Sequence, residues 1–387
     1  MPVVRRVPES DFERYRRLVQ YAFHPEDGPQ SELSVPDRIA DRYGCYEGDR
    51  LLSTGALYEL DVRLRDVWTT ISGIAAVSSP PEHRRSGNVE TLLAGLLAES
   101  RERGLGLAAL WPFEHAFYRQ FGWAISDRYT IYELPPAQLA AAGTTARGTY
   151  ERVGPDDWQR LERVQRAHGE GTTLSMGRSE QWWRSRTFGD DPPWAYAWHD
   201  GDELRGYVTY TFESANDSDV LGVDDFSAAD RDARRHLLGL LGTHDSQVEA
   251  VELTLAEEGA LLDAVADPNA VSCSVHAGPM IRVTDPALAL ESCPYPDDIA
   301  ARVVFEVTDP IGDDRRFELT VENGTGTCEP TRADPDATVD VGTLAQLLIG
   351  YRPVADVREH GLDCGEKTAA TLGALFPQEN VQLREFF

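Results

Sequence analysis

One short segment combines basic side chains with a glycine at the point where a helix is expected to begin. It reads PEHRRSG over residues 81–87, with Arg84 and Arg85 shortly before Gly87. The helix that follows is indicated by apolar residues spaced at i, i+3, i+4, i+7 and i+8, namely Val89, Leu92, Leu93, Leu96 and Leu97. A helix N-terminus presents unpaired N–H groups, and a loop glycine lets the backbone approach an anion closely. Two arginines add bidentate donors for phosphate oxygens.

This pattern predicts a site for a phosphate or diphosphate group, although a solvated helix entry would use the same residue types. The segment lacks the G-K-[ST] ending of a nucleoside-triphosphate loop and the G-x-G-x-x-G pattern of a dinucleotide site. The phosphates would therefore belong to another kind of cofactor.

The neighbouring elements must position this loop. A nearly continuous run of small and apolar residues, 70–79, precedes it and predicts a central strand covered by helices. The helix after the loop is expected over 89–103, ends at Gly104 and leads into a strand over 105–111. A short helix carrying Tyr118 follows.

The rest of the chain divides into further α/β units. Before the loop we expect a helix over residues 9–23 and two or three strands, among them 42–47, 51–60 and 62–68. Pro135 and Pro136, with the Ala/Gly/Thr-rich stretch after them, indicate a first boundary. The second unit carries predicted strands at 194–198, 205–212, 220–226 and 248–255 and a helix at 229–241. A third unit of strands followed by a helix begins near Ile281.

The PEHRRSG loop, followed by PFEHAFYRQFGW over residues 112–123, resembles the GCN5-related N-acetyltransferases (GNAT), and more closely their Eis (enhanced intracellular survival) group. The resemblance implies an α/β (α+β) fold of two tandem mixed-sheet GNAT domains and a C-terminal sterol-carrier-protein-like α+β domain. The expected domains are 1–135, which binds acetyl-CoA, 136–280, which is degenerate, and 281–387. Acetyl-CoA is then the co-substrate.

The resemblance also implies which residues meet the donor. The backbone of Val77, Ser78 and Ser79 corresponds to the strand that pairs with the pantetheine arm and polarises the thioester carbonyl. The pyrophosphate loop and first helical turn correspond to Arg84, Arg85, Ser86, Gly87, Asn88, Val89 and Glu90. Phe113 and Glu114 correspond to the positions that flank the cofactor after the next strand.

Two catalytic groups are implied by the same resemblance. Tyr118 matches the general acid, which protonates the departing CoA thiolate. The α-carboxylate of Phe387 matches the base, and the two terminal phenylalanines would form an apolar plug that docks it. Alternatively, Tyr118 is a core residue and the tail is frayed, as chain ends usually are.

The second domain lacks the donor signature. No glycine lies in the loop before its helix at 229–241, so we expect this domain to act as scaffold and pocket wall. Trp182 and Trp183 could line the acceptor cavity or fill the core, and the core is the favoured interpretation.

Composition narrows the class of protein. The chain has 37 basic and 65 acidic residues, a net charge of −28, and Lys367 is its single lysine. Such a surface would repel nucleic acid, and we expect a salt-adapted, haloarchaeal, cytoplasmic protein.

No segment has the apolar length of a membrane span, so no membrane partner is expected. Five scattered cysteines fit neither a disulfide framework nor a metal site; they are Cys45, Cys273, Cys293, Cys328 and Cys364.

The leading hypothesis is acetyl transfer from acetyl-CoA to the primary amine of a cationic small molecule, a lysine or a protein N-terminus. Glu26, Asp27 and Glu32 are candidate walls for a cationic acceptor, or simply solvated acids. The alternative is a non-catalytic acyl-CoA- or lipid-binding protein. The resemblance also implies a homo-oligomer, a hexamer or a trimer.

Overall fold

The computed structural model describes residues 2–28, 39–139, 147–215, 218–256 and 261–387. The chain forms two compact units. The first contains Met1–Asp127, Gly171–Leu174 and Pro279–Phe387, and the second contains Arg128–Glu170 and Ser175–Gly278. The chain therefore leaves its first unit after Asp127, returns to it briefly at Gly171–Leu174 and returns again from Pro279 to Phe387.

The first unit contains a mixed sheet with strands in the order β1-β2-β3-β4-β5-β15-β6. The strand bounds are Val3–Arg6 (β1), Asp41–Glu47 (β2), Arg50–Leu64 (β3), Val67–Ser78 (β4), Leu107–Leu110 (β5), Ala124–Ile125 (β6) and Met280–Val283 (β15). β4 and β5 run parallel, and the other neighbours along this order run antiparallel. β15 therefore returns from late in the sequence to complete the first sheet.

The break predicted between strands at 51–60 and 62–68 is wrong, because residues 51–64 lie in one continuous strand and residues 67 and 68 already belong to β4. β3 runs through Asp61, whose side chain faces outward between the buried Leu60 and Val62. The chain reverses only at Arg65, which adopts a left-handed conformation with φ of 54°. An exposed acidic residue in a strand thus marks the polar face and does not mark a turn.

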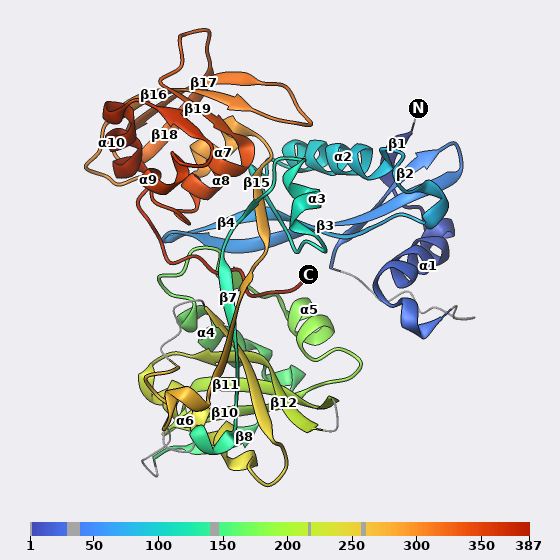
Figure 1. Ribbon diagram of the computed structural model, residues 1–387, viewed down its shortest axis with the longest axis vertical. Helices are drawn as coiled ribbons and strands as arrows, with labels where there is room; N and C mark the ends of the chain where they lie inside the picture. The colour runs from blue at the N-terminus through green and yellow to red at the C-terminus, as the bar shows by residue number, and fades with distance from the viewer. Residues whose placement is uncertain (1, 29–38, 140–146, 216–217, 257–260) are drawn as a thin grey trace. The chain divides into compact units, whose positions relative to one another are not determined.

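Helices lie on both faces of this sheet. α2 (Asn88–Glu102) and α3 (His115–Arg119) belong to the core on one face, whereas α1 (Phe12–Phe23) packs with Tyr46 and Leu51 in a separate core on the other. The apolar side of α2 is buried, and it packs with Leu57 of β3 and Ile74 of β4 in one core. The C-terminal tail lies across the long β3 and β4 strands from α2 (Figure 1).

The C-terminal domain belongs to the same compact unit and has its own sheet, in the order β18-β17-β16-β19-β20. Its strands are Ala301–Thr308 (β16), Arg315–Glu322 (β17), Thr325–Pro330 (β18), Ala337–Asp340 (β19) and Leu362–Cys364 (β20). Its helices are Pro286–Ser292 (α7), Val341–Leu348 (α8), Val354–Val357 (α9) and Glu366–Leu375 (α10). Arg65, from the β3–β4 turn, donates to the carbonyls of Pro294 and Leu375, so the hairpin of the first domain is held by the third.

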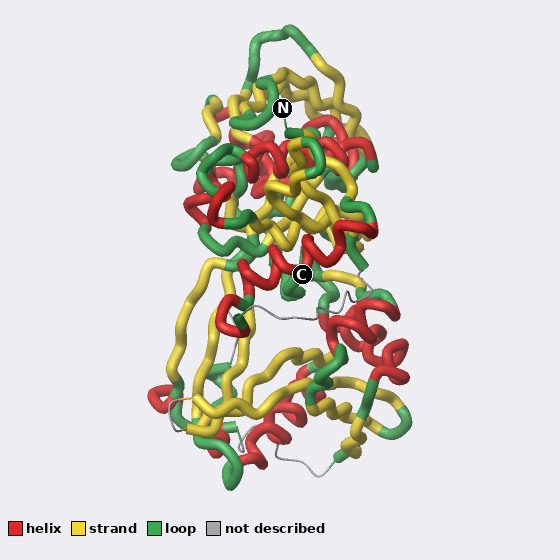
Figure 2. The backbone as a smooth tube through the Cα atoms, turned by 90° about the vertical axis from the view of Figure 1, so that its right-hand side faces the viewer, coloured by secondary structure: helices red, strands yellow, loops and turns green. Residues whose placement is uncertain are grey.

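The second unit has a sheet in the order β14-β7-β13-β12-β11-β10-β8, drawn in yellow in the lower half of Figure 2. Its strands are Arg128–Leu134 (β7), Thr149–Arg152 (β8), Trp194–Asp200 (β10), Glu203–Ala215 (β11), Ser218–Ala228 (β12), Ala250–Ala256 (β13) and Ser272–Ala277 (β14). The short strand β9 (Met176–Gly177) and the helices α4 (Trp158–His168), α5 (Glu180–Trp182) and α6 (Arg231–Leu241) complete it. Trp182 and Trp183 are both buried, and Trp183 packs on Phe188 and Tyr207, as the core interpretation predicted.

The predicted fold class is confirmed, because each of the three expected parts is built around its own sheet. All five cysteines are free thiols; three are buried, Cys364 is partly buried and Cys273 is exposed. No helix within the described ranges is both long and apolar enough to cross a membrane. The same ranges hold no cluster of three or more His, Cys, Asp or Glu side chains suited to a metal ion.

Candidate active site

The end of β4 departs from regular strand geometry. Opposite β3, the register shifts between Thr54 and Ala56, so that β4 contains an extra residue in this stretch. Ala76 lies at the bulge with φ of 51°, a conformation that costs free energy for a residue with a Cβ atom. Its carbonyl accepts a hydrogen bond from the Thr54 hydroxyl at 3.1 Å, and the Ser78 hydroxyl lies 2.5 Å from the same Thr54 oxygen.

β4 and β5 separate before this bulge. Their parallel pairing covers Ser72 with Ala108 and Gly73 with Ala109. Beyond Gly73, the edge of β4 that faced β5 has no strand partner in that pairing, while the opposite edge stays bonded to β3. Val77 and Ser78 therefore lie on a strand whose free edge could pair with an extended ligand, and Ser79 follows directly after it.

The loop after β4 turns the chain sharply into α2. Arg85 and Gly87 both have positive φ, 55° and 77°, and Gly87 is the N-cap of α2. No side chain caps this helix, whereas Asn88 uses its amide group to bind the carbonyl of His83 at 3.0 Å. The first N–H groups of α2 thus have no side-chain acceptor, and the helix N-terminus is open to an anion.

The predicted loop residues lie together at this helix N-terminus. The guanidinium Nε of Arg84 donates to the carbonyl of Ser79 at 3.1 Å, which ties the loop to the end of β4. Most of the loop side chains are exposed, whereas Asn88 is buried and Val89 packs against the α2 core; the exposed members are Arg84, Arg85, Ser86 and Glu90. Two arginines at an uncapped helix N-terminus form a cationic cradle for phosphate oxygens.

Tyr118 lies in α3 within an aromatic cluster. Its ring centroid is 5.4 Å from that of Phe113 and 5.2 Å from that of Phe117, and only 3% of the residue is exposed. Burial raises the pKa of its hydroxyl well above the ordinary value, so the group holds its proton at neutral pH. Glu114 caps α3 by accepting from the N–H of Ala116 at 3.2 Å, and Phe113 is largely exposed.

The last residue of the sequence is buried on the first domain. The ring of Phe387 is 5.8 Å from that of Tyr58, and a Cβ atom on Gly73 would lie 3.0 Å from the Phe387 ring. Phe387 is 7% exposed, but Phe386 is 67% exposed. The expectation of two buried phenylalanines was therefore wrong for Phe386, which contacts Trp111 with a centroid distance of 5.5 Å.

Tyr118 and Phe387 lie on opposite faces of the first sheet. Gly73 and Tyr58 are cross-strand partners, so both face the tail. Their neighbours Ile74 and Leu57 face the other way, into the core that contains Tyr118. The sheet where β4 and β5 separate thus has the core that contains Tyr118 on one face and the end of the tail on the other.

Two residues that hold the tail were missed in the sequence analysis. The indole N–H of Trp111 donates to the carbonyl of Glu385 at 2.7 Å. The buried carboxyl of Asp127 accepts from the N–H of Leu383 at 2.6 Å. Trp111 directly precedes the PFEH motif, which is a weak local signal, whereas nothing near Asp127 in the sequence indicates its partner.

The helix of the second unit that corresponds to α2 has a closed N-terminus. Asp230 caps α6 by accepting from the N–H of Ala233 at 2.8 Å, and it also pairs with Arg205. A carboxylate therefore takes the position that an anionic ligand would occupy. This agrees with the missing glycine in that loop.

The predicted acceptor walls are only partly described. Glu26 is exposed, with a carboxylate oxygen 4.0 Å from Nδ1 of His24. Glu32 and the side chain of Asp27 lie outside the described residues.

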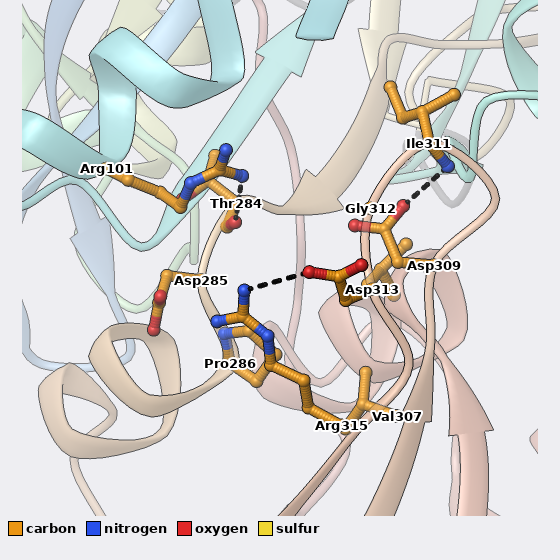
Figure 3. A pocket seen from close by; sticks show the side chains of 11 residues that line it. Arg101, Thr284, Asp285, Pro286, Val307, Asp309, Ile311, Gly312, Asp313 and Arg315 are labelled. Atoms are coloured by element: carbon orange, nitrogen blue, oxygen red, sulfur yellow. Dashed lines mark hydrogen bonds and ion pairs between the residues drawn. The ribbon is translucent and has the colours of Figure 1, made fainter.

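A pocket of about 340 Å³ lies elsewhere in the first unit, where the end of α2 meets the third domain (Figure 3). It is lined by arginines and acids, among them Arg101, Asp285, Asp309 and Arg315. None of the predicted donor-binding or catalytic residues belongs to its lining.

Comparison with protein families divides the chain in the same three parts. The acetyltransferase (GNAT) domain family matches residues 3–126 and again residues 174–283. The sterol carrier protein domain family matches residues 286–384.

Curated relatives and solved structures also show similarity to N-acetyltransferases. An uncharacterized N-acetyltransferase of Streptomyces griseus is 28% identical over an alignment of 407 positions, which covers 96% of this chain and 94% of the relative. The N-acetyltransferase Eis of Mycobacterium tuberculosis is 23% identical over an alignment of 371 positions, which covers 88% of each chain. In structure, the chain is similar to Eis1 from Mycobacterium abscessus over all of both chains, with a TM-score of 0.77 and 23% identity. A GCN5-related N-acetyltransferase from Anabaena variabilis gives a TM-score of 0.83 at 19% identity, again over all of both chains.

GNAT domains use acetyl-CoA as co-substrate. With two such domains in tandem, a sterol carrier protein domain behind them and full-length similarity to named N-acetyltransferases, the chain belongs to the Eis-like GNAT acyltransferases.

Proposed function

We propose that this chain transfers the acetyl group of acetyl-CoA to a primary amine of a cationic acceptor, at a single site in residues 1–135. The observation that carries the proposal is the position of the β4 bulge, flanked by Tyr118 on one face of the sheet and Phe387 on the other. In this proposal, residues 136–280 act as scaffold and residues 281–387 supply the tail.

The donor would bind along β4 and α2. The uncapped N-terminus of α2 and the side chains of Arg84 and Arg85 would hold the diphosphate, supported by the backbone of Ser86–Glu90. The pantetheine arm would pair with the free edge of β4 at Val77–Ser79, with Phe113 and Glu114 at its flank. N–H donors at the bulge would polarise the thioester carbonyl.

The chemical step needs an acid and a base on opposite sides of the acetyl group. The neutral amine attacks the carbonyl carbon, which forms a C–N bond and a tetrahedral intermediate. As the C–S bond breaks, the Tyr118 hydroxyl donates its proton to the departing thiolate. The α-carboxylate of Phe387, directly or through one water, takes the proton that the amine nitrogen loses. That proton returns through solvent to the tyrosinate, so the products are an N-acetyl amide and free CoA.

The cationic nature of the acceptor is supported by charge. A net charge of −28 attracts cations at long range. The arginines at the donor loop make the electrostatic potential positive only locally. The small-molecule amine, the lysine side chain and the protein N-terminus all match this chemistry.

The protein's setting is part of the proposal. The acid-rich, lysine-poor composition supports adaptation to high salt and a haloarchaeal, cytoplasmic origin, although the curated relatives come from Streptomyces and Mycobacterium. A homo-oligomer, trimeric or hexameric, is proposed on the family resemblance.

The test is release of free CoA thiol, measured with acetyl-CoA and a panel of amines. The panel contains an aminoglycoside, a polyamine, a lysine peptide blocked at its N-terminus and an uncharged primary amine of similar size. We expect turnover with at least one cationic amine and little with the uncharged amine. Tight acetyl-CoA binding without turnover on any amine would instead favour the non-catalytic acyl-CoA-binding alternative.

A further inference from the structure

The tail that carries Phe387 is fixed by a series of backbone contacts. The N–H of Thr173 donates to the carbonyl of Asn380 at 2.8 Å, and the N–H of Gln382 donates to the carbonyl of Thr173 at 2.9 Å. These bonds form a short parallel bridge between Thr173 and Val381. They hold the start of the tail, five or more residues before the carboxylate.

Asp127 contacts the tail at Leu383, between the Thr173 bridge and the chain end. Its Oδ2 atom accepts from the N–H of Leu383 at 2.6 Å, and the Leu383 side chain is 1% exposed. The backbone beside Asp127 is fixed too, because both the N–H and the hydroxyl of Ser126 donate to the carbonyl of Pro279, at 2.9 and 3.0 Å. The acceptor is thus presented to the tail from a rigid position.

Asp127 has no other evident structural task. It is 3% exposed, and its second oxygen, Oδ1, has no hydrogen-bond partner among the described residues. A buried carboxyl with a single partner is costly, and an apolar residue would fill the same space at less cost if only packing were needed. The feature that the carboxyl supplies, and an apolar side chain cannot, is an acceptor for the N–H of Leu383.

We propose that Asp127 is a positioning residue, whose bond to Leu383 sets where the α-carboxylate of Phe387 lies relative to the acetyl group. The inference rests on the proposed role of that carboxylate. Phe387 lies four positions after Leu383, and the Trp111 bond to Glu385 lies between them. The ring of Phe387 then occupies the space left free by Gly73.

The neutral form of Asp127 is sufficient for this role. Burial raises the pKa of Asp127 to about 8, so the carboxyl is protonated at neutral pH. An asparagine keeps a carbonyl oxygen of the same reach and has no charge. Asp127→Asn should therefore preserve the anchor, and Asp127→Ala should remove it.

The test measures tail docking separately from catalysis. Carboxypeptidase A removes C-terminal aromatic residues, so the release of phenylalanine from the full chain reports whether Phe387 is docked. We expect phenylalanine to be released at least tenfold faster from Asp127→Ala than from the unaltered protein. The release rate of Asp127→Asn should lie within threefold of that of the unaltered protein. The kcat of Asp127→Ala should fall at least tenfold, with unchanged acetyl-CoA affinity, and Asp127→Asn should restore it.

Two controls keep the test specific. Asp336→Ala removes another bond of this kind, in which the N–H of Val304 in the third domain donates to a carboxylate, and should alter neither rate. Leu383→Pro removes the donor and lies after the last helix, so it tests the same bond if Asp127→Ala does not fold.

The outcomes separate the two proposals. Release of phenylalanine from Asp127→Ala or Leu383→Pro at the rate of the unaltered protein would overturn the anchor. Fast release of phenylalanine with unchanged kcat would support Asp127 as the anchor of the tail and would refute the catalytic role of the Phe387 carboxylate.

Discussion

The ring of Phe387 packs on the ring of Tyr58 at a centroid distance of 5.8 Å, although 329 positions separate the two residues in the sequence (387 − 58). Tyr58 is the cross-strand partner of Gly73, three residues before the bulge at Ala76. The end of the chain is therefore bound beside the part of β4 that would hold the thioester.

Removing Phe387 should abolish most activity without unfolding the protein. Deletion moves the α-carboxylate by about 3.5 Å, one residue of chain, which is enough to lose alignment. We expect kcat to fall about 10²-fold while the melting temperature changes by only a few degrees. A short C-terminal tag, which replaces the carboxylate with an amide, should have a comparable effect, and the same tag at the N-terminus serves as the control. Full activity of the C-terminally tagged protein would exclude the carboxylate as base.

The hydroxyl of Tyr118 should matter for turnover and for little else. Tyr118→Phe keeps the ring contacts with Phe113 and Phe117, so folding and acetyl-CoA affinity should be retained while kcat falls about 10²-fold or more. Because burial raises the pKa of Tyr118, its deprotonation should not lower kcat between pH 8 and 10. Tyr46→Phe, which removes a buried hydroxyl bonded to Asp11, is the matched control. Equal turnover in the two variants would remove Tyr118 from the mechanism.

The donor loop should account for much of the acetyl-CoA affinity. We expect the double variant Arg84→Ala with Arg85→Ala to bind acetyl-CoA at least tenfold more weakly, about 1.4 kcal/mol, since each charge-assisted contact contributes about 1.5–3 kcal/mol. Titration calorimetry measures this directly. Arg17→Ala with Arg50→Ala removes two exposed arginines of the same domain and should leave the affinity unchanged. Equal affinities for the two double variants would move the diphosphate away from the loop.

The titration of Asp127 should make stability depend on pH. Its pKa is raised to about 8 by burial, whereas an unfolded aspartate titrates near 3.8, so the folded state binds the extra proton between these values. The stabilisation is complete below pH 3.8 and is lost as the pH rises toward 8. Between pH 5 and 8, the free energy of unfolding should decrease by at least about 1.4 kcal/mol relative to Asp127→Asn, the equivalent of one pKa unit. A constant difference between the two proteins in urea titrations would mean that Asp127 does not titrate in this range.

Salt should stabilise the fold. With a net charge of −28, repulsion among acidic side chains opposes the compact state, and the screening length falls from about 10 Å at 0.1 M salt to about 3 Å at 1 M. We expect the melting temperature to rise by at least about 10 °C between 0.1 and 2 M KCl. Tetramethylammonium chloride at equal ionic strength should give a similar rise if screening is the cause. A melting temperature that does not change with salt would contradict the proposed adaptation.

The sequence by itself determined the position of the proposed donor loop and the elements around it. The periodicity of Leu92–Leu97 predicts α2, and Gly87 marks the loop before it, because both signals depend on neighbours only a few residues away. The same local signals identify α3 from the PFEHAFYRQFGW motif. The second unit's helix is also predicted correctly, and the missing glycine before it corresponds to the side-chain cap that Asp230 provides.

Only the tertiary structure decided which distant segments meet. β15 completes the first sheet, although the whole second unit separates it from β5, and β7, just before Pro135, belongs to the second sheet. Asp127 and Leu383 are 256 positions apart, and neither has a local pattern that names its partner. Pairing of this kind is set by the shape and hydrogen-bonding groups of the folded surface, which no short stretch of sequence encodes. The loop proposed to bind the donor was therefore predictable from the sequence, whereas the contacts that hold the chain end were not.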